Sequence, residues 1–361
     1  MDHHLETGDE YILSEFSYSM NDDDNKSLLQ VRRYNQCFYI SLTPENLESS
    51  PTIKQEYLRF LEAERADFDH NGQSNGSVDP EDFYDWALKP CLPLLKDIAP
   101  VPKQLPRMSL YDYYYPEKLH YCLHALNDML IPIKVPKTDS FLPPGVLLEP
   151  SMFSTDWPTF NASEVFLSFT NLSQAMCPTA HKVIIQNSRN AEVICFFKPF
   201  GINETNLAAR EVTNYRKITE ANLAPGVRIC RPQGIVKDDC DRLMGLLLTY
   251  IDCGYVTLAC AAANRDTPDS HRRKWVKQVE ETVAQLHDAG LVWGDAKPEN
   301  VLIGKVDGVS GEEKGDVDAW LIDFGGGYTR GFVDKEKAGT VEGDLQGLEN
   351  LTRYVFECER Y

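Results

Sequence analysis

The stretch that decides the fold is residues 292–303, Val-Trp-Gly-Asp-Ala-Lys-Pro-Glu-Asn-Val-Leu-Ile, and it is followed by Leu-Ile-Asp-Phe-Gly at residues 321–325. The first stretch brings Asp295, Lys297 and Asn300 into one short loop, and Asp323 follows in the second stretch. Hard cations such as Mg²⁺ take oxygen ligands, and a nearby lysine neutralises the charge of a phosphate. The pattern therefore predicts a site that handles phosphate groups together with a metal ion.

These motifs resemble the catalytic loop and the Asp-Phe-Gly turn of the protein kinase-like superfamily. The alternative is a loop with capping Asp and Asn residues followed by an unrelated turn. The amphipathic stretch at 270–289 and the 28-residue spacing from Asp295 to Asp323 argue against that alternative. The resemblance implies that Asp295 accepts or orients the proton of an attacking hydroxyl group and that Lys297 stabilises the moving phosphoryl group. It also implies Mg²⁺ binding by Asn300 and Asp323.

The same resemblance implies an ATP site upstream. Lys198 ends the apolar strand predicted at 193–197 and is expected to bind the α- and β-phosphates, paired with Glu211 or alternatively with Glu204. A solvated strand end and a solvated helix face are the ordinary alternatives for this lysine and these acids. The backbone of the segment after the apolar strand at 243–250 is expected to bind the adenine edge, and the floor under adenine follows the catalytic loop: Tyr250, Ile251, Asp252 and Leu302.

Asp344 opens the last predicted helix. The resemblance implies that this carboxylate supports the backbone of the catalytic loop, and its ordinary alternative is a helix N-cap. Both roles are compatible with one side chain.

The expected fold class is α+β, with a bilobal kinase-like domain at residues 157–361. Its N-lobe (157–250) is expected to be small and mostly antiparallel β with one helix, and its C-lobe (251–361) shortened and mainly helical. The arrangement is similar to kinase-like proteins common in fungi, in which a helical region precedes the core. Residues 1–150 are accordingly predicted to be mainly helical and to end in a Pro-rich linker at 131–150, with helices at 52–66, after Asp79-Pro80 and at 117–129, and a loosely ordered start over 1–35.

Two departures from the family pattern bear on activity. No glycine occurs between Gly145 and Gly201, so the Gly-rich phosphate loop is absent, and the turn near 171–174 takes its place. Trp293-Gly294 stands where the family has His-Arg before the catalytic Asp, which removes the usual charge partner of a phosphorylated activation loop.

Net charge, apolar runs and cysteine spacing make some classes of binding partner and some cellular locations less plausible. The net charge of −19 disfavours binding to nucleic acid or to an anionic membrane surface. Neither a signal peptide nor a run of 18 apolar residues is visible, and the ten cysteines show no C-x-x-C spacing, so a cytoplasmic or nuclear location is expected. The oligomeric state is left open.

The leading interpretation is an ATP- and Mg²⁺-dependent phosphotransferase. Its acceptor is expected to be a hydroxyl group on a small molecule or on an unusual protein. A pseudokinase scaffold without catalysis is the alternative from another class, favoured by the missing glycines. A third possibility keeps the nucleotide but transfers a nucleotidyl group.

Overall fold

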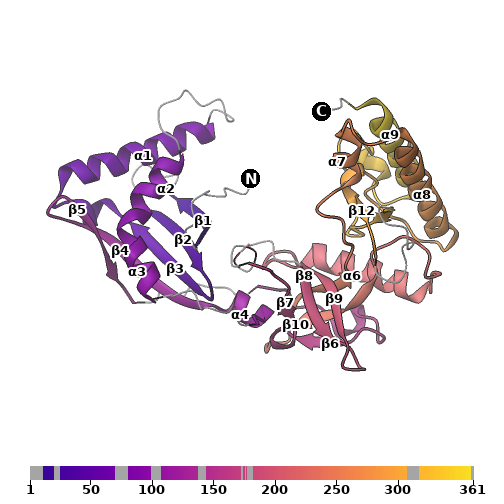
Figure 1. Cartoon of the computed structure of the whole chain (residues 1–361), viewed down its shortest axis with the longest axis horizontal. Helices are drawn as coiled ribbons and strands as arrows, with labels where there is room; N and C mark the ends of the chain where they lie inside the picture. Colours follow the sequence, from indigo (N-terminus) through magenta and orange to yellow (C-terminus); the bar gives the residue numbers. More distant parts are fainter. Residues whose placement is uncertain are drawn as a thin grey trace. The chain divides into compact units, whose positions relative to one another are not determined.

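The computed structural model describes residues 11–19, 25–69, 80–98, 107–136, 144–171, 174, 176, 182–306 and 317–358, without the side chains of 66–69. The chain forms two compact units, residues 1–141 with 166–180 and residues 142–165 with 181–361. Each unit contains its own sheet and its own helices (Figure 1). In the ranges given above, we find no helix long and apolar enough to cross a bilayer.

The first unit is built on a five-stranded sheet in the order β1-β2-β3-β4-β5, antiparallel except for the parallel pair β3–β4. Helices α1, α2 and α3 pack on one face of this sheet (Figure 1), and their buried side chains share one core with alternate residues of β2, β3 and β4. The bounds are β1 (Ile12–Tyr18), β2 (Ser27–Arg33), β3 (Gln36–Leu42), α1 (Pro51–Asp69), α2 (Pro80–Leu88), α3 (Leu92–Ile98), α4 (Leu110–Tyr114), β4 (Glu117–Leu126), β5 (Met129–Lys134) and β7 (Phe166–Leu167).

The expectation of a mainly helical N-terminal region was wrong, although helices α1 and α2 were predicted. The segment 117–129, expected to be a helix, forms β4 up to Leu126 and enters β5 at Met129. In β4 the buried residues on the core face recur with a period of two: Leu119, Tyr121, Leu123 and Ala125. Period two is the spacing of a strand with one face on a core.

Two further expectations for this region were wrong in part. Residues 1–35 were expected to be loosely ordered at the start, and residues 1–10 lie outside the described part of the chain. The stretch that follows contributes β1 and β2, and Leu29 and Val31 of β2 are fully buried. The start of the expected linker at 131–150 belongs to β5, which pairs with β4. Pro132 is tolerated there because β5 is an edge strand, where one side of the backbone needs no ladder partner.

In the second unit, five strands form a sheet in the order β6-β10-β11-β9-β8, antiparallel except for β6–β10. Gly245 in β11 lets β9 approach closely, because a Cβ atom at this position would lie 2.3 Å from the carbonyl oxygen of Lys198. The strands are β6 (Thr159–Asn161), β8 (Lys182–Gln186), β9 (Glu192–Pro199), β10 (Pro232–Lys237) and β11 (Leu243–Thr249).

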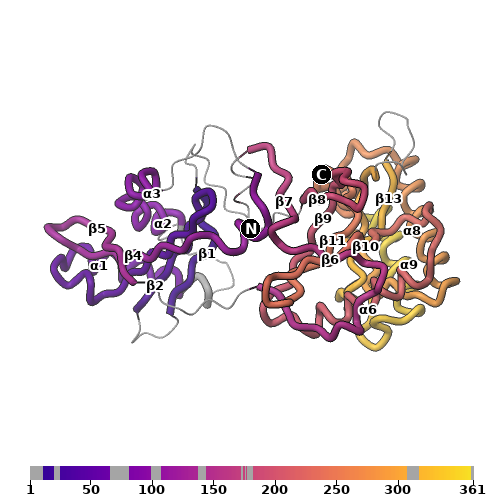
Figure 2. Tube along the Cα trace, turned by 90° about the horizontal axis from the view of Figure 1, so that it is seen from below, coloured from indigo at the N-terminus to yellow at the C-terminus, as the bar shows by residue number. Residues whose placement is uncertain are grey.

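The helices of the second unit and its strands bury side chains in one shared hydrophobic core. Helix α6 (Thr205–Glu220) buries residues spaced three and four apart, among them Ala208, Glu211 and Tyr215. The remaining elements, α7 (Leu258–Ala263), α8 (Asp269–Asp288), the hairpin β12 (Val301–Gly304) and β13 (Asp318–Leu321), and α9 (Val341–Glu357), share this core. Helices α8 and α9 lie side by side in both views (Figures 1 and 2).

Candidate active site

The loop between α8 and β12 gathers the predicted catalytic residues around one carboxylate. Asp295 is nearly buried, and its Oδ2 lies 2.9 Å from Lys297 Nζ. The amide of Asn300 donates to the same Oδ2 at 3.2 Å and to the Asp295 carbonyl oxygen at 3.0 Å. Asp295, Lys297 and Asn300 therefore form one hydrogen-bonded cluster, as the sequence spacing predicted.

A fourth residue of this cluster was not predicted. Thr329 Oγ1 donates to Asp295 Oδ1 at 3.0 Å and accepts from Lys297 Nζ at 3.0 Å. This hydroxyl ties the segment after Asp-Phe-Gly to the catalytic loop. A lone threonine in a sequence of this composition gives no signal of its own, so only the fold reveals it.

The backbone of the loop is held by a buried carboxylate from α9. Asp344 Oδ2 accepts from Trp293 N at 2.8 Å, and its Oδ1 accepts from Gly294 N at 2.8 Å. The ring of His287 lies 2.9 Å from the same Oδ2. Thr340, rather than Asp344, caps α9, since its side chain accepts from Gly343 N. The contacts of Asp344 are thus those expected of a buttress, and the N-cap alternative does not hold.

Two glycines allow the close packing around this loop. Gly294 has a φ of +96°, and a Cβ atom there would lie 3.2 Å from the Cα of Gly326. A Cβ atom on Gly347 of α9 would lie 2.6 Å from the Cβ of Ala296 and 2.7 Å from its carbonyl oxygen. The residue before Asp295 is therefore glycine for a local steric reason.

Lys198 connects three elements of the second unit. It projects from β9 and its Nζ lies 2.7 Å from Glu211 Oε1 on α6 and 2.9 Å from Asp323 Oδ1. Glu204, the alternative partner, is exposed and instead accepts from the backbone of Gly201 at 2.6 Å. Of the two acids considered from sequence, Glu211 is the one that pairs with the lysine.

Helix α6 also anchors the Asp-Phe-Gly turn. Asn214 Nδ2 donates to the Phe324 carbonyl at 2.7 Å, and Arg210 Nη2 donates to the Gly326 carbonyl at 3.3 Å. The buried ring of Phe324 packs edge-on against Tyr215, with 5.6 Å between the ring centroids. Asp323 itself has a φ of +59°, a conformation that Asp adopts more readily than most residues.

Electrostatics follow from these contacts. Burial raises the pKa of Glu211 above its ordinary value, and the nearby ammonium of Lys198 opposes this only in part. Burial opposes ionisation of Lys198, but the carboxylates of Glu211 and Asp323 outweigh it, so its pKa is raised. Burial also acts against ionised Asp323, and Lys198 outweighs it and lowers the pKa. Lys198 and Asp323 are therefore held in their charged forms.

The segment expected to bind adenine keeps only part of its backbone available. Asp252 N donates to the Lys305 carbonyl at 2.8 Å, and Lys305 N donates back to the Asp252 carbonyl at 3.1 Å. For Tyr250 and Ile251, by contrast, the described part of the chain offers no backbone hydrogen-bond partner. Leu302 of β12 is half-buried against the same core and bridges to Thr257.

The oxygen atoms present fit a divalent cation. The hydrogen bonds of these two side chains to described residues are made by Asp323 Oδ1 and Asn300 Nδ2. Asp323 Oδ2 and Asn300 Oδ1 accept none from the described residues and are available to a cation. Ile322 N donates to the Asn300 carbonyl at 3.0 Å, so the segments carrying the two side chains are bonded together. Mg²⁺ usually takes one or two protein oxygens and completes its shell with water and substrate phosphates. No closed cage of three or more His, Cys, Asp or Glu occurs in the parts of the chain that the structure describes.

The turn near 171–174, predicted to replace the Gly-rich phosphate loop, lies mostly outside the described residues. The predicted roles of Lys198, Glu211, Asp295, Lys297 and Asn300, like those of the other site residues, stay predictions, although the structure brings these side chains together.

Comparison with protein families gives an independent result. The model of the lipopolysaccharide kinase (Kdo/WaaP) family matches residues 204–355, from the start of α6 almost to the end of α9. The matched range contains Glu211, the catalytic loop, the Asp-Phe-Gly turn and Asp344, and it begins just after Lys198. The match to this family of kinases indicates that the matched range is a kinase-like phosphotransferase domain. The match at residues 204–355 is thus to a member family of the protein kinase-like superfamily, as the catalytic-loop motif predicted.

Proposed function

We propose that this protein transfers the γ-phosphoryl group of ATP to a hydroxyl acceptor. The observation that carries the proposal is the position of Lys198, whose ammonium contacts Glu211 at 2.7 Å and Asp323 at 2.9 Å. In kinases, the lysine–glutamate ion pair and the Asp of the Asp-Phe-Gly turn must both be in place before catalysis. Asp323 lies 125 residues beyond Lys198 in the chain, so local sequence alone does not produce this contact.

Each group then has a defined task. Lys198 would bind the α- and β-phosphates and is kept oriented by Glu211. Asp323 and Asn300 would hold Mg²⁺, which supplies neutralisation of the phosphate charge when it is bound. Asp295 would accept or orient the proton of the acceptor hydroxyl, and Lys297 would neutralise charge on the transferred group. Positioning and electrostatics of this kind account for most of the catalysis in phosphoryl transfer.

The acceptor we favour is a hydroxyl group on a small molecule or glycan. The matched family is named for kinases of lipopolysaccharide, which is not a protein. The Trp293-Gly294 pair supports the same direction, because it lacks the arginine through which activation-loop phosphorylation usually acts. An unusual protein acceptor is the other member of this class.

A pseudokinase scaffold is the second candidate function. It is favoured by the absence of glycine between Gly145 and Gly201 and by the use of the Asp252 backbone in a bridge to Lys305. In this case the folded site would serve a partner rather than a reaction.

The test is an acceptor screen read by product mass. The purified chain is incubated with ATP, Mg²⁺ and panels of sugars, amino alcohols and Ser/Thr peptides, with Asp295→Asn as the inactive control. A product heavier by one phosphoryl group, formed by the parent chain alone, supports the proposal. A product carrying a nucleotidyl group would reassign the reaction, and nucleotide binding without any product would favour the scaffold.

A further inference from the structure

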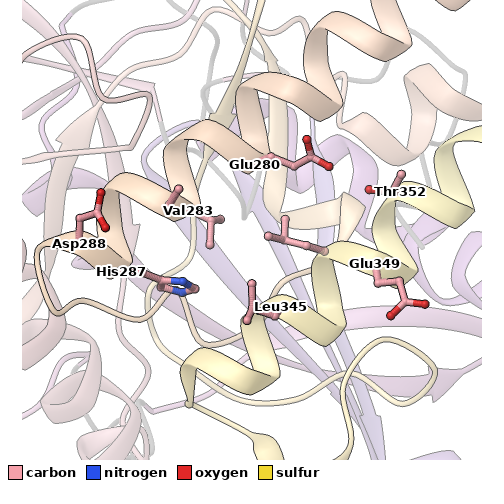
Figure 3. Close-up of a pocket in the computed structure, with 9 residues that line it drawn as sticks. Glu280, Val283, His287, Asp288, Leu345, Glu349 and Thr352 are labelled. Atoms are coloured by element: carbon pink, nitrogen blue, oxygen red, sulfur yellow. The ribbon is translucent and has the colours of Figure 1, made fainter.

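Helices α8 and α9 border a groove that the catalytic residues do not use. The groove has a volume of about 660 Å³ and is open to solvent along the two helices (Figure 3). Its floor is apolar and comes from both helices, whereas its rim carries carboxylates. The nine lining residues are Glu280, Val283, Ala284, His287, Asp288, Leu345, Leu348, Glu349 and Thr352.

The apolar floor continues along one face of α9. Val341, Leu345, Leu348, Thr352 and Phe356 follow one another at spacings of three or four residues, which places them on one side of a helix. Leu345 is 55% exposed, Val341 is 43% exposed and Phe356 is 36% exposed. A surface helix of a globular domain normally turns such a stripe toward a core. Among the described residues of the second unit, Leu348 of this stripe is buried in the core, whereas Val341, Leu345 and Phe356 stay exposed.

The rim of the groove is acidic for a reason visible in the sequence of α8. The basic residues of this helix lie in its first half, at 272–277, and the acidic residues Glu280, Glu281 and Asp288 lie in its second half. The groove borders that second half. Glu349 adds a carboxylate from α9, where Arg353 is its ion-pair partner at 3.0 Å. None of the nine described residues that line the groove is Lys or Arg.

We propose that this groove, defined by its nine lining residues, binds an amphipathic helix with basic flanks from a partner protein. The geometry favours a helix, because two helices packed side by side leave a groove that accepts the ridge of a third. Charge favours basic flanks, because Glu280 and Asp288 of α8 line the groove and none of the nine lining residues is Lys or Arg. A second copy of this chain is disfavoured as occupant, because each copy carries a net charge of −19.

The inference of a docking site does not rest on the proposed phosphoryl transfer. The groove lies on the side of α9 that carries Leu345, and the catalytic loop contacts α9 through Asp344 and Gly347. Helix α9 therefore borders the groove on one side and supports the catalytic loop on another, so a helix bound in the groove would contact the element that supports this loop.

The test uses a fluorescent synthetic peptide as the probe and the full chain as the receptor. The peptide has about 18 residues, roughly the length of α9, with Leu at helical spacing and Lys at the other positions. A scrambled peptide of the same composition, in which the Leu residues no longer share one face, has the same charge. Fluorescence anisotropy then gives the Kd of each peptide.

Two variants and a matched control locate the binding. Leu345→Asp removes the floor and should abolish specific binding; its side chain is exposed, so the fold should survive. Glu280→Lys should weaken the periodic peptide about fivefold, as expected for exposed charges. Glu281→Lys makes the same charge change one residue away, outside the groove, and should leave the Kd within about twofold.

The proposal is overturned if the scrambled peptide binds as tightly as the periodic peptide, since the attraction would then be unspecific. It is also overturned if Leu345→Asp binds like the parent chain, or if sedimentation shows a dimer of the parent chain that this variant abolishes. In that last case the stripe would be an interface between two copies.

Discussion

Asp344→Ala offers a demanding test of how the catalytic loop is supported. The carboxylate of Asp344 is 1% exposed and accepts hydrogen bonds from two backbone donors, Trp293 N and Gly294 N, both at 2.8 Å. Alanine leaves both donors buried without an acceptor, and each such loss costs about 1–3 kcal/mol. The ring of His287 also loses its partner, but this side chain is 15% exposed and can turn to water. We expect a loss of about 3–5 kcal/mol of unfolding free energy for the second unit.

The assay is thermal unfolding followed by near-ultraviolet circular dichroism. Trp275, Trp293 and Trp320 are buried in the second unit and report on its packing. A loss of this size should lower the Tm by about 6–20 °C for a unit of this length. The matched control is Asp334→Ala, an acid with a 60% exposed side chain, whose loss should cost less than about 0.5 kcal/mol. A loss below about 1 kcal/mol in Asp344→Ala would refute the reasoning, because the two donors would then have found other partners.

Three further predictions concern the loop and the lysine. Thr329→Val removes the hydroxyl that bridges the acid and the lysine of the catalytic loop, and should lower kcat roughly 10–100-fold, the worth of a hydrogen bond to a charged group. Gly347→Ala should cost about 1–3 kcal/mol by overpacking, since its Cβ atom would lie 2.6 Å from that of Ala296, and it should lower kcat as well. Burial raises the pKa of Glu211 above its ordinary value of 4.5, so on acidification this acid takes up a proton at a pH above 4.5. Protonated Glu211 no longer holds Lys198 as an ion pair, and nucleotide binding should weaken in the same pH range.

Each of these predictions has its own control. Thr329→Ser should retain activity, and a serine variant as slow as the valine variant would mean that the methyl group matters instead. Gly226→Ala should be harmless, because a Cβ atom there meets nothing within 4 Å; an equal loss at both glycines would argue against the packing account. The pH at which binding fails is compared with the pH of unfolding. The raised pKa of Glu211 means that its protonation favours the fold, so coincidence of the two transitions would contradict the assignment.

The sequence was informative where chemistry depends on spacing within one segment. Asp295, Lys297 and Asn300 meet because they share one loop, so their order along the chain already implied a cluster. Lys198 and Glu211 were found because a strand end and the helix after it are close in sequence and each has a regular pattern. The contact of Asp344 with the catalytic loop was expected from the resemblance alone, and the helix start expected at Asp344 lies at Val341, with Thr340 as its cap.

The sequence was misleading where two periods compete or where contact is made across the fold. Leu119, Leu123 and Leu126 are spaced for a helix, yet Leu119, Tyr121, Leu123 and Ala125 are buried with the period of a strand. Thr329 joins the catalytic cluster from a segment without regular structure, and its contacts depend on how the chain returns after Asp-Phe-Gly. Gly347 is required by its distance from Ala296, and such a distance is set only by packing between distant elements.

The central claim is that Lys198, Asp323 and the catalytic loop form a working nucleotide and metal site. The most direct test is a thermal shift of the full chain with ATP and Mg²⁺, alongside Asp323→Ala. The variant should still fold, because this side chain is 44% exposed, but it should lose about 1–2 kcal/mol, because alanine tolerates the φ of +59° less well than Asp. At 100 times its Kd, the nucleotide should stabilise the parent chain by about 2.7 kcal/mol, in a metal-dependent way that the variant loses. The absence of a shift at millimolar ATP, or an equal shift in Asp323→Ala, would contradict the claim.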